Sequence, residues 1–309
     1  MTVVPPTLTR LRRIALAALL LILAVTTLSA YMRLANAGLG CADWPACYGA
    51  QLRTPDAAIT TSDTSVAIAR VLHRLAAMTV LVLALTIAAA AFSSRPRQVR
   101  EAALAVALIA VALGLAVLGR YSAGAVLPII AIGNVLGGFA MVALSFATWR
   151  GATPGTRWSR PASVLLALIV VQIASGVLVS ASYSGLSCTG FPDCGGAVDL
   201  SWSLLDPMRV PRFEASLPIH PEGALAQMLH RGLALLVTLA AVATGIAAWR
   251  NGQRRAAAML VAVLTVQIGL GITLVLAALP FAAALMHNLV AALMLIATMA
   301  CLRERRAPV

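Results

Sequence analysis

The chain has 309 residues, of which 61% are hydrophobic and 11% charged, and its formal net charge is +13. The mean hydropathy of +0.94 is typical of a polytopic membrane protein and excludes an ordinary soluble domain. The net charge alone would also suit a nucleic-acid-binding protein, but the distribution of that charge along the chain argues against nucleic acid as a partner.

Eight apolar segments are each long enough to cross a bilayer as a helix, which takes about 20 residues. They lie at 12–30, 66–92, 102–119, 126–148, 161–182, 223–249, 256–279 and 281–302. The first segment follows three arginines and resembles a signal peptide. Its apolar part is too long for one, so we expect it to be retained as a helix. The sequence therefore predicts an all-α polytopic membrane protein with eight transmembrane helices.

The basic residues are distributed unevenly along the chain. All 23 are arginine, and fifteen lie in five clusters, at 10–13, 95–100, 150–160, 250–255 and 303–306. In a chain of eight helices these clusters share one side of the membrane. They contain or directly adjoin only two acids, Glu101 and Glu304, whereas the rest of the chain has eight arginines and eight acids. This positive-inside pattern predicts cytoplasmic termini in a bacterial inner membrane, surrounded by lipid, with the loops at 31–65 and 183–222 outside.

These two external loops carry the same pattern, Gly-Leu-x-Cys-x-x-aromatic-Pro-x-Cys. It runs over 38–47 in the first loop and over 185–194 in the second, so the cysteines repeat at an offset of 147 residues. A His-Arg pair follows each loop, at 73–74 and at 230–231. The repetition predicts two duplicated four-helix bundles, 1–150 and 151–309, in parallel orientation because each has an even number of helices.

The four loop cysteines form two close pairs. The space outside a bacterial inner membrane is oxidising, so we expect separate Cys41–Cys47 and Cys188–Cys194 disulfides. Each bridge is either a structural staple or a redox-active pair, and spacing alone does not set a reduction potential. Zinc is disfavoured because the loops hold too few histidines for two closed sites. Cys301, at the end of the last segment, is expected to be a buried thiol.

Three of the four histidines lie inside predicted helices. His73, His230 and His287 are each about 10 Å below the external surface, at about 1.5 Å of rise per residue. Ionisable side chains inside a membrane are costly and mark candidate functional sites. Two histidines on facing helices can ligate a haem iron from both sides. The alternative for each is an interhelical hydrogen bond. His230 and His287, in one half, predict a six-coordinate haem.

In the first half, His73 corresponds to His230, and Asn134 takes the place of His287. Asparagine is a poor iron ligand but a good hydrogen-bond donor. The first half is therefore expected to be five-coordinate or open, as substrate chemistry requires. Arg74 and Arg231 follow the two histidines and are long enough to reach haem propionates near the interface.

Taken together, the paired cysteine loops, the His-Arg pairs and the last-helix histidine resemble the haem A synthase family of cytochrome oxidase biogenesis, over nearly the whole chain. The resemblance implies an oxidoreductase that oxidises a methyl group of haem O to the formyl group of haem A. It implies a b-type haem on His230 and His287, with substrate haem O beside His73. Haem O synthase and cytochrome oxidase subunits are the partners it suggests, and a homo-oligomer is an alternative state.

Two residues depart from the pattern of that family. Arg70 stands where the family usually has glutamate, and Asn134 where it usually has histidine. Both lie in the expected substrate half, so the resemblance is weaker there. Two other functions also fit the sequence: a non-catalytic haem-binding assembly or electron-transfer protein that uses only the second half, and a thiol–quinone oxidoreductase whose chemistry resides in the cysteine pairs.

Overall fold

The computed structural model describes residues 6–50, 64–122, 127–151, 156–195, 199, 201–211 and 220–305. Its long helices are α1 (Pro6–Asn36), α3 (Thr64–Ser93), α4 (Val99–Ser122), α5 (Pro128–Arg150), α6 (Arg160–Ala181), α7 (Ala224–Arg250), α8 (Arg254–Leu276) and α9 (Phe281–Cys301). All eight are long and apolar enough to cross a membrane. This confirms the predicted all-α class with eight membrane helices. Parts of both cysteine-bearing loops, 51–63 and 212–219, and Arg306 lie outside the described residues.

Prolines mark the starts of several helices. Pro128 opens α5, Arg160-Pro161 opens α6, and Pro280 directly precedes α9. A proline is tolerated at these positions because the first N–H groups of a helix have no intrahelical acceptor. Short 3-10 turns in the external loops lie at Ser184–Leu186, Ser203–Leu205 and Pro221–Gly223.

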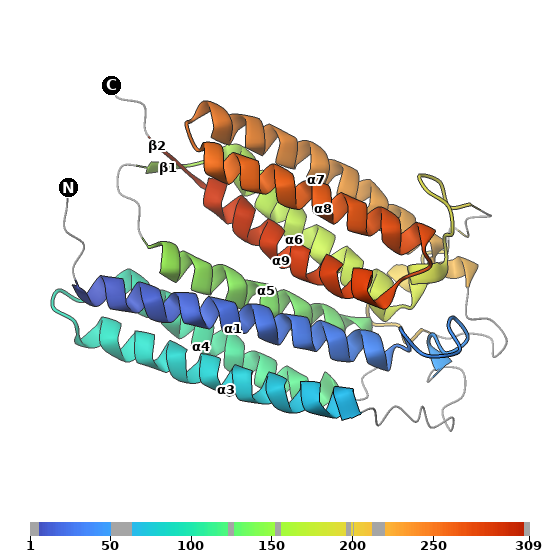
Figure 1. Ribbon diagram of the computed structural model, residues 1–309, viewed down its shortest axis with the longest axis horizontal. Coiled ribbons are helices and arrows are strands. Elements are labelled where there is room, and N and C mark those ends of the chain that lie inside the picture. The colour runs from blue at the N-terminus through green and yellow to red at the C-terminus, as the bar shows by residue number, and fades with distance from the viewer. Residues whose placement is uncertain are drawn as a thin grey trace.

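One pair of short strands was not predicted from the sequence. β1 (Thr156–Trp158) precedes α6, and β2 (Arg303–Arg305) follows α9; they pair antiparallel with Thr156 opposite Arg305. The backbone N–H of Ser159 extends the pairing by donating to the Leu302 carbonyl at 2.9 Å. The segment between the two halves is thereby joined to the last helix at the end of the molecule where N and C lie (Figure 1).

The helices form two layers (Figure 1). One contains α1, α3, α4 and α5, and the other contains α6, α7, α8 and α9. In each layer every helix packs against the next one in sequence, and the first also packs against the fourth. The layers meet through α1 and α5 on one side and α6 and α9 on the other. The first and last helices of each layer therefore build the interface, an arrangement compatible with the predicted duplication.

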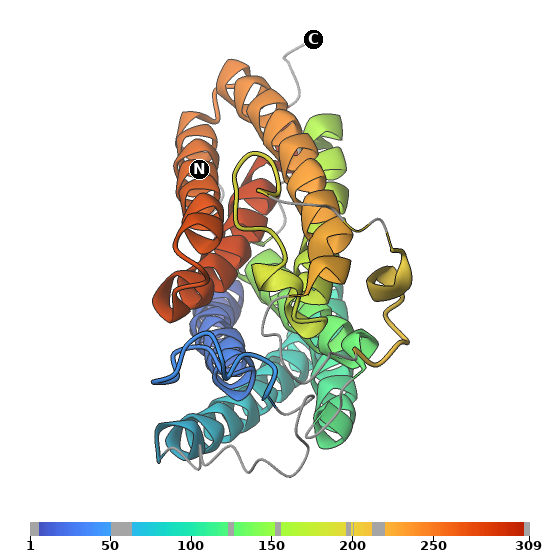
Figure 2. The same cartoon turned by 90° about the vertical axis from the view of Figure 1, so that its right-hand side faces the viewer.

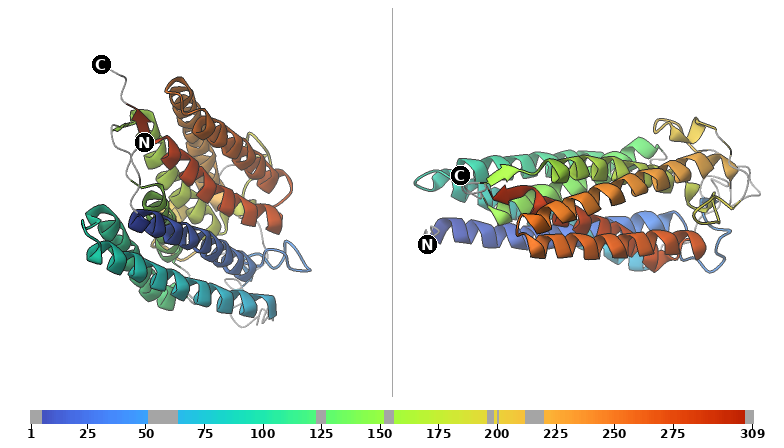
Figure 3. Two further views of the ribbon diagram at one scale, coloured as in Figure 1. Left: turned by 60° about the vertical axis from the view of Figure 1, so that its left-hand side comes forward. Right: turned by 90° about the horizontal axis from the view of Figure 1, so that it is seen from above.

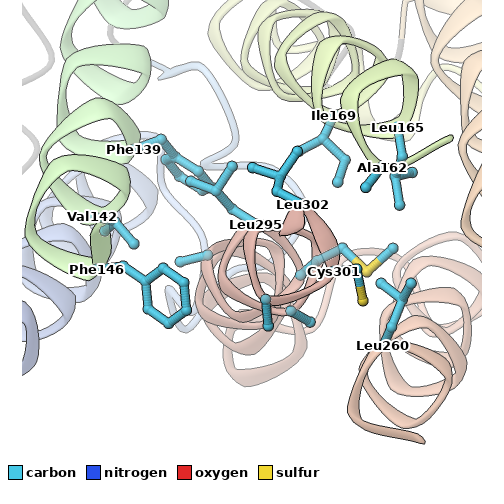
Figure 4. Packing of buried hydrophobic residues seen from close by; sticks show 14 of the residues in the cluster. Phe139, Val142, Phe146, Ala162, Leu165, Ile169, Leu260, Leu295, Cys301 and Leu302 are labelled. Carbon is cyan, nitrogen blue, oxygen red and sulfur yellow. The ribbon is translucent and has the colours of Figure 1, made fainter. Parts of the chain in front are cut away.

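The interface between the layers is a continuous apolar cluster (Figure 4). Phe139, Val142 and Phe146 of α5 lie toward Leu295 of α9, and Ile169 of α6 completes the contact. Inside a bilayer the lipid tails are as apolar as these side chains, so close packing rather than the hydrophobic effect holds such an interface together. Close packing of side chains therefore holds the helices of both layers in position.

The loops after α1 and α6 lie at one end of the molecule, and both described chain ends lie at the other (Figures 2 and 3). The cysteine-bearing loops therefore share a side, opposite the arginine clusters that flank the helix ends.

The side of the membrane that each end faces is open to a direct test. Trp202 is exposed in the loop after α6, and Arg97 is exposed between α3 and α4 at the opposite end. We expect a membrane-impermeant maleimide, applied to intact cells, to label Trp202→Cys and to spare Arg97→Cys, because the arginine-rich side stays cytoplasmic. Cell lysis before labelling is the control that makes both positions reactive. Labelling of Arg97→Cys alone in intact cells would reverse the orientation.

Candidate functional site

His230 lies in the second turn of α7 and contacts two polar side chains of α6. The Ser175 hydroxyl is 2.8 Å from His230 Nδ1. The Gln172 amide nitrogen lies 3.2 Å from Nδ1 and 3.3 Å from Nε2, and it donates to the backbone carbonyl of His230 at 3.2 Å. Gln172 and Ser175 are three residues apart, so both lie on the α6 face toward α7. The imidazole is therefore held in place by its own helix bundle.

His287 lies in the second turn of α9 and contacts α8. The Gln267 amide nitrogen is 3.2 Å from His287 Nε2. The other ring nitrogen, Nδ1, is buried without a hydrogen-bond partner among the described residues. A buried ring nitrogen without a partner is costly, and it is the kind of atom that binds a metal.

The two histidines have the same kind of neighbour, built from one short motif. Val171-Gln-Ile-Ala-Ser-Gly176 on α6 and Val266-Gln-Ile-Gly-Leu-Gly271 on α8 share the pattern Val-Gln-Ile-x-x-Gly. In each case the glutamine contacts a histidine and the glycine lies beside the same ring. A Cβ at Gly176 would stand 2.8 Å from His230 Cε1, and one at Gly271 would stand 3.6 Å from His287 Cε1. A glutamine inside each of two apolar segments is the sequence signal from which this support could be predicted.

His230 and His287 are residues that could hold a haem iron together. They belong to α7 and α9, which pack in one layer. A haem iron needs only two axial protein ligands, since the porphyrin occupies its other positions. A ligating histidine usually has its second nitrogen hydrogen-bonded, which Ser175 provides for His230. Two glycines leave space beside the rings.

Arg231 extends from the same turn of α7 into the loop closed by the second cysteine pair. One terminal nitrogen, Nη1, donates to the carbonyls of Gly190, Pro192 and Asp193 at 2.9, 3.3 and 2.7 Å. The guanidinium carbon lies 5.9 Å from the centre of the Phe191 ring. Nε and Nη2 are buried without partners among the described residues. Arg231 thus anchors the loop and retains two donors for another acceptor.

The first half has a different character around its candidate residues. His73 on α3 and Asn134 on α5 are partly buried, and Arg70 and Arg74 are exposed along α3. No hydrogen bond of the His73 ring or the Asn134 amide occurs within the described part of the chain. The helices α1, α3, α4 and α5 contain no glutamine. The structure therefore places His73 and Asn134 on α3 and α5, which each pack against α1 and α4, without the polar support that His230 and His287 receive.

Both predicted disulfides are present, Cys41–Cys47 and Cys188–Cys194. The described part of the first loop, up to residue 50, contacts the second half. Trp44 donates from its indole nitrogen to the Ala278 carbonyl at 3.1 Å, in the turn between α8 and α9. Tyr48 packs edge-on against Tyr183 at 5.4 Å between ring centres. The described part of the first loop therefore lies over one end of the second half, beside the start of the helix that carries His287.

His220, the fourth histidine of the chain, and Cys301 have other surroundings. His220 contacts the Tyr183 carbonyl through Nε2 at 3.0 Å. Burial lowers the pKa of His220, so its imidazole is neutral near pH 7. Cys301 is the free cysteine of the described chain and is buried in the apolar interface. His220 is a loop residue and Cys301 a core residue, as expected.

Fold and site together define a polytopic membrane protein of eight helices with a supported histidine pair in its second half. The chain belongs to the cytochrome oxidase assembly protein family, whose model matches residues 12–299. It is 28% identical over 304 residues to a heme A synthase of Shewanella oneidensis, covering 89% of this chain and 90% of that relative. A heme A synthase of Methylorubrum extorquens is 39% identical over 140 residues, which cover 44% of this chain and 35% of that relative. A heme A synthase of Methylobacterium radiotolerans is 34% identical over 155 residues, which cover 47% of this chain and 38% of that relative.

Steric fit around His230 can be tested with the two glycines as a matched pair. Gly271→Ala introduces a methyl group at ordinary contact distance and should stabilise its helix by up to about 1 kcal/mol. Gly176→Ala forces the His230 ring away from Ser175 and should destabilise by roughly 1 kcal/mol or more. Thermal unfolding in detergent, followed by circular dichroism, measures both. Equal melting temperatures for the two variants would contradict the contact between Gly176 and the ring.

Proposed function

We propose that the protein is a haem A synthase that oxidises a methyl group of haem O to the formyl group of haem A. Membership of the cytochrome oxidase assembly family across residues 12–299 carries this assignment. The full-length similarity to a heme A synthase supports it, because that similarity spans both halves. Haem O is then the substrate, and haem O synthase and cytochrome oxidase subunits are the proposed partners. The proposed location is a bacterial inner membrane with periplasmic cysteine loops.

The second half is the proposed site of a resident b-type haem, with His230 and His287 as axial ligands. When bound, such a haem supplies one-electron transfer. The Ser175 hydroxyl donates to the Gln172 carbonyl at 2.9 Å, so its oxygen is left to accept a hydrogen bond from Nδ1–H of His230, which would fix the tautomer of that ring. Gln267 orients the His287 ring. The spare donors of Arg231, Nε and Nη2, suit a propionate carboxylate, which an arginine binds through two parallel hydrogen bonds.

The first half is the proposed substrate site. His73 is the candidate ligand for the substrate iron, and Arg74, one position further round α3, is the candidate partner of a propionate. Asn134 on α5 would offer an amide donor inside this substrate site. Arg70 lies on the same face of α3 as His73, but it stays protonated and cannot act as a base. The reaction in this chain therefore has to proceed without a carboxylate at position 70.

A second function is favoured by the same residues. Arg70, Asn134 and the absence of glutamine from the first-half helices remove much of the polar support that a second haem needs. A chain that binds only the resident haem would serve as a non-catalytic assembly or electron-transfer protein. The alternative function, a thiol–quinone oxidoreductase, has no comparable support, because the two disulfide-closed loops pack over one end of the second half.

Haem retention tests the proposed ligands. His230→Ala and His287→Ala should each abolish the low-spin b-type absorption spectrum of the purified protein, because one axial ligand is lost. His73→Ala should retain that spectrum at close to the wild-type intensity, since His73 lies in the other half. The reverse pattern, with haem lost only in His73→Ala, would exchange the roles of the two halves.

Activity is tested in a host that makes haem O and lacks its own synthase. Haem A should accumulate with the wild-type chain and fall at least tenfold with His73→Ala, because positioning of the substrate dominates such a reaction. Extracted haems are resolved by chromatography. Haem A produced only by Asn134→His would show that the missing histidine silences the first half. A wild-type chain with bound b-type haem and no haem A would establish the assembly or electron-transfer function.

A further inference from the structure

Arg33 is a first-half residue whose guanidinium is bound by the second half. It lies near the external end of α1, donates from Nη1 to the Ser180 hydroxyl of α6, and donates from Nη2 to Asn288 Oδ1 of α9 at 3.0 Å. Among the described residues no carboxylate lies within ion-pairing distance of it. A cation inside a membrane helix is costly and is a candidate functional residue.

The position of Arg33 in the sequence repeat explains why it has a serine for a partner. Arg33 and Ser180 are 147 residues apart, the same offset that relates the two cysteine motifs. Equivalent positions of the two halves therefore meet across the interface. An arginine in both copies would bring two like charges together in a medium of low dielectric constant. One copy supplies the cation and the other supplies the acceptor.

The second partner of Arg33 connects it to the histidine site. Asn288 directly follows His287 in α9. Its amide nitrogen donates to the Ala284 carbonyl at 2.8 Å, while its oxygen accepts from Arg33. The amide is thus fixed at both ends, and the turn of α9 that carries His287 is tied to α1. Burial raises the pKa of the neighbouring Tyr48, so that hydroxyl stays neutral and does not offset the charge of Arg33.

We propose that Arg33 is a positioning residue that the first half contributes to the second-half histidine site. It holds the α9 turn bearing His287, and it places a fixed positive charge beside the haem that this site takes. Reduction of a ferric haem adds one electron, so a nearby cation stabilises the reduced form and raises the reduction potential. The inference rests on the proposed haem ligation by His230 and His287.

The test is a redox titration of the purified haem-loaded protein. Arg33→Gln should lower the midpoint potential of the haem, because it removes the charge. Arg33→Lys should leave the potential close to the wild-type value, because it keeps the charge. Arg120→Gln is the matched control, since Arg120 is exposed near the external end of α4 and the same charge is lost there. Its potential should equal that of the wild type.

Two further variants separate charge from structure. Ser180→Asp keeps Arg33 and sets a carboxylate beside it, so the potential should fall even if Arg33→Gln is not recovered folded. Asn288→Ala keeps the charge but releases the α9 turn, so the low-spin electron paramagnetic resonance signal should shift or broaden while the potential changes less than in Arg33→Gln.

The outcomes distinguish this inference from the function on which it rests. A wild-type chain that binds no haem defeats the proposed haem site itself. A wild-type chain with haem, and an unchanged potential in both Arg33→Gln and Ser180→Asp, overturns the role of Arg33 alone. A lowered potential in Arg120→Gln of the same size would show a general effect of net charge and would also overturn it.

Discussion

An imidazole inside a bilayer has no water to bond with, and the second half of this protein is organised by that constraint. Each buried ring needs a donor or acceptor from a neighbouring helix. Gln172 and Gln267 provide it from α6 and α8, and a glycine one turn further along each helix leaves space for the ring. The spacing of glutamine and glycine thus sets how α6 meets α7 and how α8 meets α9.

The two halves are related in sequence, but they differ in the number of polar side chains that support a histidine. The second half supports two histidines with two glutamines and a serine. The first half contributes its cysteine loop and Arg33 to that same region, through Trp44 at the turn before α9 and through Asn288 on α9. The end of the second half that lies beside the cysteine loops is therefore assembled from both halves.

Much of this architecture follows from local sequence signals. Apolar length predicts the eight helices, the arginine clusters indicate which helix ends share a side, and the repeated cysteine pattern predicts the two disulfides. The polar support of the histidines could have been predicted from the sequence, because a glutamine in an apolar segment is as unusual as a histidine. The docking of the first loop on the second half could not have been predicted, because it depends on contacts such as Trp44 with Ala278 between residues far apart in the chain. The pairing of β1 with β2 was missed for the same reason.

We propose above all that His230 and His287 hold one haem between α7 and α9. This proposal is tested most directly by the haem content and spin state of the purified wild-type chain, measured by pyridine haemochrome assay and low-temperature electron paramagnetic resonance. We expect one b-type haem per chain with the low-spin signature of two imidazole ligands. A chain purified with no haem, or with a haem that is high-spin, would contradict it.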